Sequence, residues 1–178
     1  MSLSNSITKL LNFKEDNLIF DENFFESRTI KKKCFIIKGY LFNNYEFCPK
    51  CGCINEKAII KKGIDKCLIK INKISEMTSY LELNKQIYKC KNCNKKFTAQ
   101  SNIINFGCRI SNNVKLAILN CAKEMMSKSL IAKLYNVSDN TVQDVFDSVF
   151  YNDNVYKTFW ICVNFLDTFF RTILFDRI

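Results

Sequence analysis

Two pairs of cysteines have the spacing of metal ligands. Cys48 and Cys51 form one pair, Cys90 and Cys93 form the other, and each pair encloses two residues. This spacing lets both sulfurs of a pair point at one ion, and Gly52 permits a tight backbone turn after the first pair. Four thiolates complete a tetrahedral shell and leave no open position for catalysis. The sequence therefore predicts a structural Zn²⁺ site on Cys48, Cys51, Cys90 and Cys93.

Other interpretations of these cysteines are weaker. A rubredoxin-type iron site usually carries glycine after each pair, whereas Asn94 follows the second pair here. A redox pair needs a thioredoxin-like context, which the sequence lacks. Cys53 lies close enough to compete as a ligand, although its Cys-Gly-Cys spacing is poor for sharing an ion. We interpret the remaining cysteines as small buried hydrophobic residues: Cys34, Cys67, Cys108, Cys121 and Cys162.

The chain contains no histidine, which excludes histidine ligands and both Ser-His and Cys-His catalysis. Residues 1–10 lack the charged and long apolar regions of a secretion signal. We therefore expect a reducing, cytoplasmic environment, in which paired cysteines bind metal rather than form disulfides.

Basic residues are concentrated around the cysteine pairs. The formal net charge is +10, and residues 48–100 hold twelve lysines against four acidic residues. Such a patch favours a polyanionic partner, because each neutralised phosphate releases a counterion. Solubility is the alternative explanation for so many lysines. The candidate phosphate contacts surround the second cysteine pair: Lys85, Lys89, Lys91, Lys95 and Lys96. We expect the interleaved Tyr88 and Phe97 to pack beneath the cysteines rather than to stack on bases.

The elements that must position these residues give an α+β chain. We expect a helix within 4–13, a buried strand at 34–42 and a β-hairpin from strands 67–71 and 80–88, separated by a polar stretch through Lys73, Ser75 and Glu76. Apolar residues then recur at spacings of three and four, which predicts helices from Ser111 to about Phe150. The expected segments are a small N-terminal α/β segment (1–47), a zinc ribbon (48–100), a connector (101–110), a helix-turn-helix (111–150) and an aromatic tail (151–178).

Residues 128–147 fit a helix-turn-helix preceded by a helix at about 112–125, which carries Leu116, Ile118, Leu119 and Ala122. Ile131, Ala132 and Tyr135 are expected on the inner face of the first helix of the pair. Asn136 tolerates the left-handed turn, and Val137 plugs it. Ser138 is suited to capping the second helix, on which Val142 and Val145 face inward. The exposed candidates for contact with DNA bases are Ser138, Asp139, Asn140, Gln143 and Asp144. An ordinary antiparallel helix pair is the alternative.

These motifs occur together and in order, and the combination resembles the N-terminal half of ISL-three family insertion-sequence transposases. The resemblance covers about residues 5–157. It is carried by Cys48-Pro49-Lys50-Cys51-Gly52, by Tyr88 to Ala99, by Ile110-Ser111-Asn112-Asn113, by Ile131-Ala132-Lys133 and by Asn136-Val137-Ser138. It implies a bacterial, nucleoid-associated protein that binds the terminal inverted repeats of a mobile element as double-stranded DNA, with the full-length transposase as a further partner.

The tail departs from that family, which continues into a catalytic domain with three acidic residues. Asp167 lies near the place of the first, but a single carboxylate cannot assemble a two-metal site. We therefore expect a truncated or frameshifted copy without catalytic activity. A stand-alone zinc-ribbon transcription regulator and an active enzyme are the alternatives. Residues 158–175 approach membrane-spanning length, but Asp167 and Arg171 favour a buried or partly exposed helix and no membrane partner.

Overall fold

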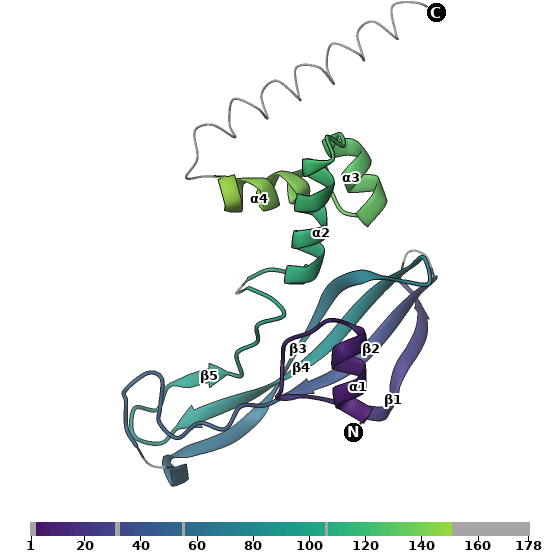
Figure 1. The fold of residues 1–178 in the computed structure, drawn as a ribbon. Helices are drawn as coiled ribbons and strands as arrows, with labels where there is room; N and C mark the ends of the chain where they lie inside the picture. Colours follow the sequence, from purple (N-terminus) through teal and green to yellow (C-terminus); the bar gives the residue numbers. More distant parts are fainter. Residues whose placement is uncertain (1–2, 31–32, 55, 106, 151–178) are drawn as a thin grey trace, which may run out of the picture. The chain divides into compact units, whose positions relative to one another are not determined.

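The computed structural model describes residues 3–30, 33–54, 56–105 and 107–150 (Figure 1). The chain divides into two compact units, Met1–Asn113 and Val114–Ile178, and each is described by itself. The described residues combine a five-stranded sheet with four α-helices, which confirms the predicted mixture of α and β structure. The tail predicted at 151–178, with Cys162 and Asp167, lies outside the described residues. Among the described helices, none is long and apolar enough to cross a membrane.

The first unit consists of helix α1 and a sheet in the order β1-β2-β4-β3, with β5 also paired to β4. Among the named strands of the described residues, the pairing of β2 with β4 is parallel and the other pairings are antiparallel. The elements are α1 (Leu3–Leu10), β1 (Leu18–Thr29), β2 (Lys33–Leu41), the short 3-10 helix η1 (Glu56–Ala58), β3 (Ile59–Ile74), β4 (Met77–Cys90) and β5 (Lys96–Thr98). The parallel pairing places the expected segments 1–47 and 48–100 in one sheet rather than in two separate parts.

The predicted helix and strands of this unit are present, and two further strands are added. Strands β3 and β4 form a longer hairpin than the pattern indicated. Its turn consists of Ser75 and Glu76, both with positive φ (48° and 61°), as a two-residue hairpin turn requires. The sequence did not reveal β1, because the register shifts between Phe20 and Phe25 and this irregularity breaks the apolar alternation. The three-residue β5 is too short to leave a periodic pattern.

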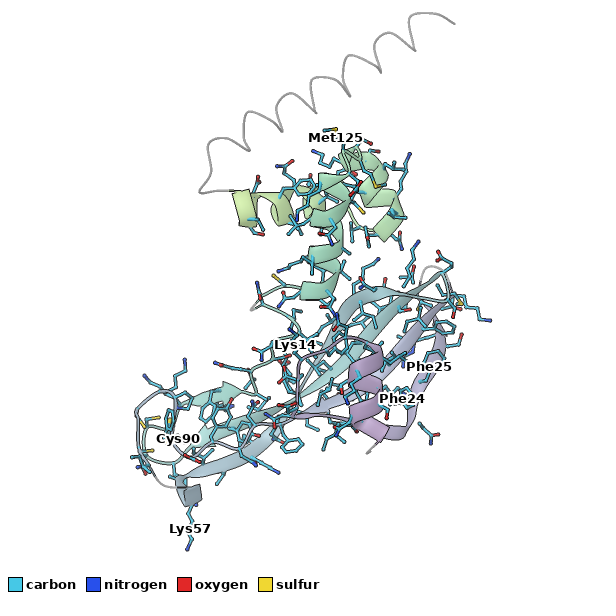
Figure 2. The ribbon with its side chains drawn as sticks, in the orientation of Figure 1. Lys14, Phe24, Phe25, Lys57, Cys90 and Met125 are labelled. Carbon is cyan, nitrogen blue, oxygen red and sulfur yellow. The ribbon has the colours of Figure 1, made fainter. Side chains whose placement is uncertain are left out.

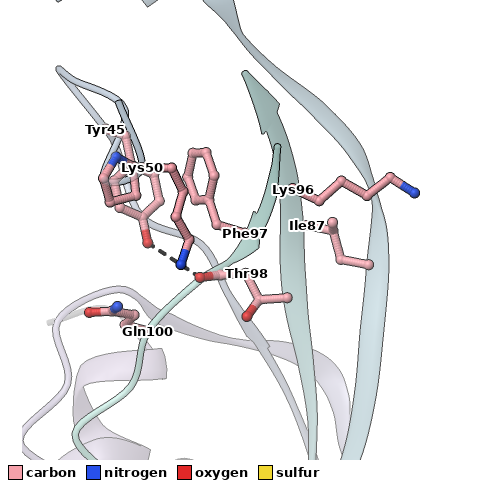
Figure 3. Close-up of a pocket in the computed structure, with 8 residues that line it drawn as sticks. Tyr45, Lys50, Ile87, Lys96, Phe97, Thr98 and Gln100 are labelled. Atoms are coloured by element: carbon pink, nitrogen blue, oxygen red, sulfur yellow. Dashed lines mark hydrogen bonds between the residues drawn. The ribbon is translucent and has the colours of Figure 1, made fainter. Parts of the chain in front are cut away.

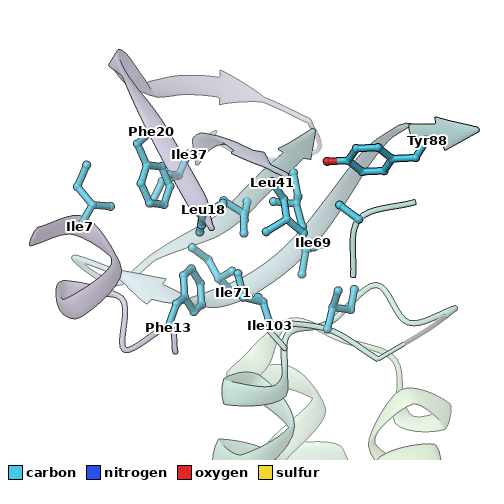
Figure 4. Packing of buried hydrophobic residues seen from close by; sticks show 14 residues of the cluster. Ile7, Phe13, Leu18, Phe20, Ile37, Leu41, Ile69, Ile71, Tyr88 and Ile103 are labelled. Atoms are coloured by element: carbon cyan, nitrogen blue, oxygen red, sulfur yellow. The ribbon is translucent and has the colours of Figure 1, made fainter. Parts of the chain in front are cut away.

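The core of the first unit lies on the side of the sheet that α1 covers (Figure 4). Leu81 and Leu83 of β4 are fully buried beside Ile69 of β3 and Ile37 of β2. Ile7 contributes a buried apolar side chain from α1. The central strand therefore provides the middle of the core, and strands on both sides complete it.

The second unit contains α2 (Asn112–Lys123), which begins at the unit boundary, α3 (Lys128–Tyr135) and α4 (Asp139–Phe150). Ser127 caps α3 by accepting a hydrogen bond from the Leu130 N–H. Asn136 ends α3 in the predicted left-handed conformation, with φ 51°, and Ser138 Oγ accepts from the Thr141 N–H as the predicted cap of α4. These local features are confirmed. The identification of α3 and α4 as a DNA-binding helix-turn-helix stays a prediction.

The helices bury a small core of their own. Its members are Val114, Ile118, Ile131, Ala132, Val142, Val145 and Phe146. Tyr135, which was expected on the inner face, is only half-buried. This partial burial, together with the Cys121 thiol 3.6 Å from the Tyr135 hydroxyl, raises the pKa of Tyr135 to about 12. Leu116, expected with the apolar residues of α2, is 58% exposed. Phe146, which the sequence pattern did not indicate, is instead a principal buried side chain.

Gly39 and Gly63 provide a matched pair of substitutions in the sheet. A Cβ atom at Gly39 would lie 2.9 Å from Leu18 Cδ1 and 3.3 Å from Phe20 Cε1, whereas one at Gly63 would meet nothing within 4 Å. We expect Gly39→Ala to lower the free energy of unfolding by about 1–3 kcal/mol, the usual cost of overpacking a core. Gly63→Ala should be neutral or slightly stabilising. Urea unfolding followed by circular dichroism measures both, and equal stabilities would contradict the close packing at Gly39.

Candidate metal centre and basic surface

Each cysteine pair lies in a tight turn that backbone hydrogen bonds close. In the first, the Gly52 N–H donates to the Cys48 carbonyl at 2.8 Å, and Gly52 has the positive φ of 70° that glycine readily adopts. In the second, the Cys90 N–H donates to the Lys95 carbonyl at 3.1 Å, and Asn94 takes a left-handed φ of 61°. Asn94 therefore fills the position where a second glycine was missing from the sequence pattern.

The two turns bring four thiols together. The sulfurs of Cys48, Cys51, Cys90 and Cys93 all lie within 4.8 Å of one another, so this group is able to hold a metal ion. The Sγ atoms of Cys48 and Cys93 are 3.8 Å apart, and those of Cys51 and Cys90 are 3.9 Å apart. A tetrahedral ion with bonds to sulfur of about 2.3 Å spaces its ligands by about 3.8 Å. These two distances match a tetrahedral site, and the other sulfur pairs of the group lie within 4.8 Å.

The four ligands differ in exposure and in proton affinity. Cys48 and Cys90 are buried, Cys93 is half-buried and Cys51 is exposed. The Cys93 backbone N–H, together with the Cys53 thiol, lowers the pKa of Cys90 to about 6. The Lys95 N–H lowers the pKa of Cys93, but burial and the thiols of Cys51 and Cys90 outweigh this effect and raise that pKa to about 11. The thiol of Cys90 therefore loses its proton more readily than the thiol of Cys93.

Cys53 is closer to this centre than its sequence spacing indicated. Its Sγ atom lies 3.5 Å from Cys90 Sγ, although it is not a member of the group of four. Of the other cysteines interpreted as small hydrophobic residues, Cys34 is buried and its thiol donates to the Arg28 carbonyl. Three more are half-buried: Cys67, Cys108 and Cys121.

Three aromatic rings pack together beside the second cysteine pair. The rings of Tyr88 and Phe97 stack with centroids 5.7 Å apart, and Tyr45 meets both edge-on at 5.1 Å. The Tyr88 hydroxyl donates to the Asn43 carbonyl at 2.8 Å and accepts from the Asn43 N–H. These contacts tie the segment before Cys48 to β4 and β5. The expectation that Tyr88 and Phe97 have a packing role is confirmed.

A pocket of about 620 Å³ adjoins this aromatic group (Figure 3). It includes two lysines, Lys50 and Lys96, and no acidic side chain. Lys50 lies over the same side of β5 as Tyr45 and Phe97, whereas Lys96 points to the other side (Figure 3). The remaining lining residues are Pro49, Ile87, Thr98 and Gln100. The surface next to the first cysteine pair is therefore both aromatic and basic.

The predicted phosphate-contacting lysines lie around the second pair. Lys89 and Lys96 are register partners on β4 and β5, so they share one face of the sheet. Lys91 and Lys95 are exposed in the turn between these strands, and Lys85 lies farther along β4 opposite Asp65. Further exposed lysines, which the sequence pattern did not single out, lie before and along β3: Lys57, Lys61, Lys62 and Lys66. Lys57 lies at the end of the unit that carries Cys90 (Figure 2), and Lys61 pairs with Tyr88, two residues before Cys90.

The charge is distributed unequally between the two units. Residues 1–113 contain twenty basic and ten acidic residues, a surplus equal to the net charge of the whole chain. In the second unit the candidate base-contacting residues lie at the start and along the length of α4. Ser138 Oγ is engaged in capping and Gln143 Nε2 donates to Asp147, while Asp139, Asn140 and Asp144 are exposed.

The four-thiol group gives a direct expectation for metal binding. Purified protein should contain one metal ion per chain, and Cys90→Ser should abolish stoichiometric binding because it removes a buried ligand. Chelation should unfold the end of the sheet formed by residues 48–100, since binding free energy at such a site is also folding free energy. Elemental analysis and circular dichroism measure these effects. Cys67→Ser, in the same unit, is the control and should retain the metal; spectra unchanged by chelation would contradict the metal centre.

No protein-family model, no curated protein and no solved structure matches this chain. A conclusion about function therefore depends on the geometry, burial and charge of the described residues.

Proposed function

We propose that this chain is a zinc-stabilised DNA-binding protein that recognises the terminal inverted repeats of an insertion sequence. The observation that carries the proposal is the closed group of four thiols at a lysine-rich end of the sheet. Nothing in this arrangement requires catalysis by the chain itself.

The ligand set supports zinc as the metal. All four candidate ligands are thiols, and their spacing fits tetrahedral coordination. Zinc has no geometric preference from its d electrons and is commonly held by four thiolates in structural sites. Because four protein ligands fill the shell, no position remains for a reacting water molecule, and the role of the ion is to stabilise the fold.

The distribution of charge supports DNA as the partner. Lys89 and Lys96 share a face of the sheet, and Lys91 and Lys95 are exposed in the turn between the same strands. Lysines in such a group neutralise phosphates and release counterions, an effect that dominates nonspecific affinity for DNA. The first unit, which carries the whole surplus of positive charge, therefore supplies the phosphate contacts.

Base recognition is assigned to α4 by its exposed polar residues. Asn140 follows the cap of the helix and is exposed, and an asparagine amide is able to make two hydrogen bonds to adenine. The sequence of α4 contains three aspartates, Asp139, Asp144 and Asp147, and neither lysine nor arginine, so this helix is poorly suited to bind phosphate. In this proposal, the first unit contacts the phosphates and the second unit contacts the bases.

The mobile-element target rests on the resemblance of the cysteine pairs and the 110–138 segment to ISL-three family transposases. Of the residues that carry this resemblance, Gly52 turns the first cysteine loop, and Asn136 and Ser138 form the junction of α3 and α4. A protein with these features would occupy transposon ends in the cytoplasm, at the nucleoid. It would share those sites with a full-length transposase.

The lysine contacts are tested by the salt dependence of DNA binding. The double variant Lys89→Gln, Lys96→Gln should reduce the slope of log affinity against log salt by about 0.9 for each phosphate that is no longer neutralised, without changing sequence preference. Lys73→Gln is the matched control, because Lys73 is exposed at the opposite end of the β3–β4 hairpin. Fluorescence anisotropy with a labelled duplex gives the slopes. Equal slopes for both variants and the unmodified protein would show that Lys89 and Lys96 do not contact DNA phosphates.

Sequence recognition is tested by competition between terminal inverted repeat DNA and a scrambled duplex. Asn140→Ala should cost about 1–3 kcal/mol in binding the repeat, the usual value of one bidentate base contact, and should leave the scrambled duplex unaffected. Asn120→Ala, which changes an exposed asparagine of α2, is the control. Equal affinity of the unmodified protein for both duplexes at moderate salt would reject repeat recognition while leaving DNA binding intact.

A further inference from the structure

Cys53 lies within ligand distance of a buried member of the metal centre. Its Sγ atom is 3.5 Å from Cys90 Sγ, whereas the Sγ of Cys51 is 3.9 Å from the same atom. Sulfurs that share a tetrahedral zinc ion are about 3.8 Å apart. Cys51 and Cys53 therefore reach Cys90 equally well, although only Cys51 belongs to the group of four.

The backbone of the first loop explains how two cysteines reach one place. The Gly52 N–H donates to the Cys48 carbonyl at 2.8 Å, and the Cys48 N–H donates to the Cys53 carbonyl at 3.0 Å. The positive φ of Gly52 permits this reversal of the chain. The two hydrogen bonds close the loop on itself and hold Cys51 and Cys53 on the same turn, one on each side of Gly52.

The other three ligands are held more firmly than Cys51. Cys48 and Cys90 are completely buried, and Cys93 is half-buried with its sulfur 3.8 Å from that of Cys48. Cys51 is exposed, whereas Cys53 is half-buried. Cys53 thus lies beside Cys90 as Cys51 does, and the exposed Cys51 is the member of the group that it is best placed to replace.

We propose that Cys53 is an alternative fourth ligand, which replaces Cys51 and lets the centre hold one ion through either of two four-thiolate sets. In the exchange, the Cys53 sulfur bonds to the metal as the bond from Cys51 breaks, and the proton of the Cys53 thiol passes to Cys51. The total charge of the shell is unchanged, and no oxidation or reduction occurs. The inference depends on the proposed zinc centre and is independent of DNA binding.

Cobalt substitution of the full chain tests the exchange, because charge-transfer absorption of Co²⁺ grows with the number of bound thiolates. The variants are Cys51→Ser, Cys53→Ser, the double variant and the control Cys67→Ser. We expect a four-thiolate spectrum for the unmodified protein and for all three single variants. The double variant should lose roughly a quarter of the charge-transfer intensity, since one of four metal–sulfur bonds is missing, or lose cobalt entirely.

Each other outcome has a defined meaning. A three-thiolate spectrum or loss of cobalt in Cys51→Ser would overturn the role of Cys53 and leave the four-cysteine centre intact. Failure of the unmodified protein to bind cobalt or zinc would overturn the centre itself together with this inference. DNA binding does not enter either result, so the two proposals fail separately.

Alkylation of the zinc-loaded protein provides a second readout. If the two sets exchange, one thiol of the loop is free at any time, and mass spectrometry of the peptide that contains the loop should find a single label divided between Cys51 and Cys53. A label confined to Cys53 would contradict exchange, because it would mean that Cys51 never leaves the metal.

Discussion

The hydrogen-bonded register of β4 determines where the chemistry of this protein lies. This strand pairs with β2, β3 and β5, and it ends at Cys90. Leu81 and Leu83 anchor this strand in the core, and Cys90, seven residues after Leu83, is buried beside the other candidate ligands. A slip of one residue would exchange the two faces of the strand. It would expose Leu81 and Leu83 and would also move the second cysteine pair away from the first.

The end of the sheet that carries the cysteines has little apolar burial of its own. Residues 61–66 of β3 are exposed, in contrast to Ile69 and Ile71 in the same strand. The packed rings of Tyr45, Tyr88 and Phe97 hold the cysteine loops against β4 and β5. A metal ion bound by four thiolates would supply the remaining stabilisation, because a small β-hairpin extension cannot bury enough surface by itself. The side chains of Lys61, Lys62, Lys91 and Lys95 are exposed in this region.

The separation of charge between the two units has a consequence for how DNA would be bound. The sheet unit carries the entire positive surplus, while the described helices carry as many acidic as basic residues in Val114–Phe150. Electrostatic attraction to phosphates is not sequence-specific, whereas side chains such as the amides of asparagine and glutamine hydrogen-bond to the edges of particular bases. In the proposed function, a chain with these two units attracts DNA through one and discriminates sequence through the other.

Local features could be predicted from the sequence because they depend on residues a few positions apart. The CxxC spacing, the left-handed Asn136, the Ser138 cap and the buried Val142 and Val145 are of this kind, and each is present. The hairpin between the cysteine pairs followed from its apolar strands and polar turn.

Other features depend on contacts between distant residues, and only the tertiary structure decided them. The parallel pairing of β2 with β4 joins segments that the sequence pattern separates, and the irregular β1 has a place only because β2 offers an edge. Burial of Phe146 and exposure of Leu116 follow from how the helices pack, which periodicity alone does not determine. The approach of Cys53 to Cys90 across the loop closure belongs to the same class. The sequence thus determined which cysteines are able to bind a metal. The long-range strand register and the closure of the first loop decided which of their sulfurs come together.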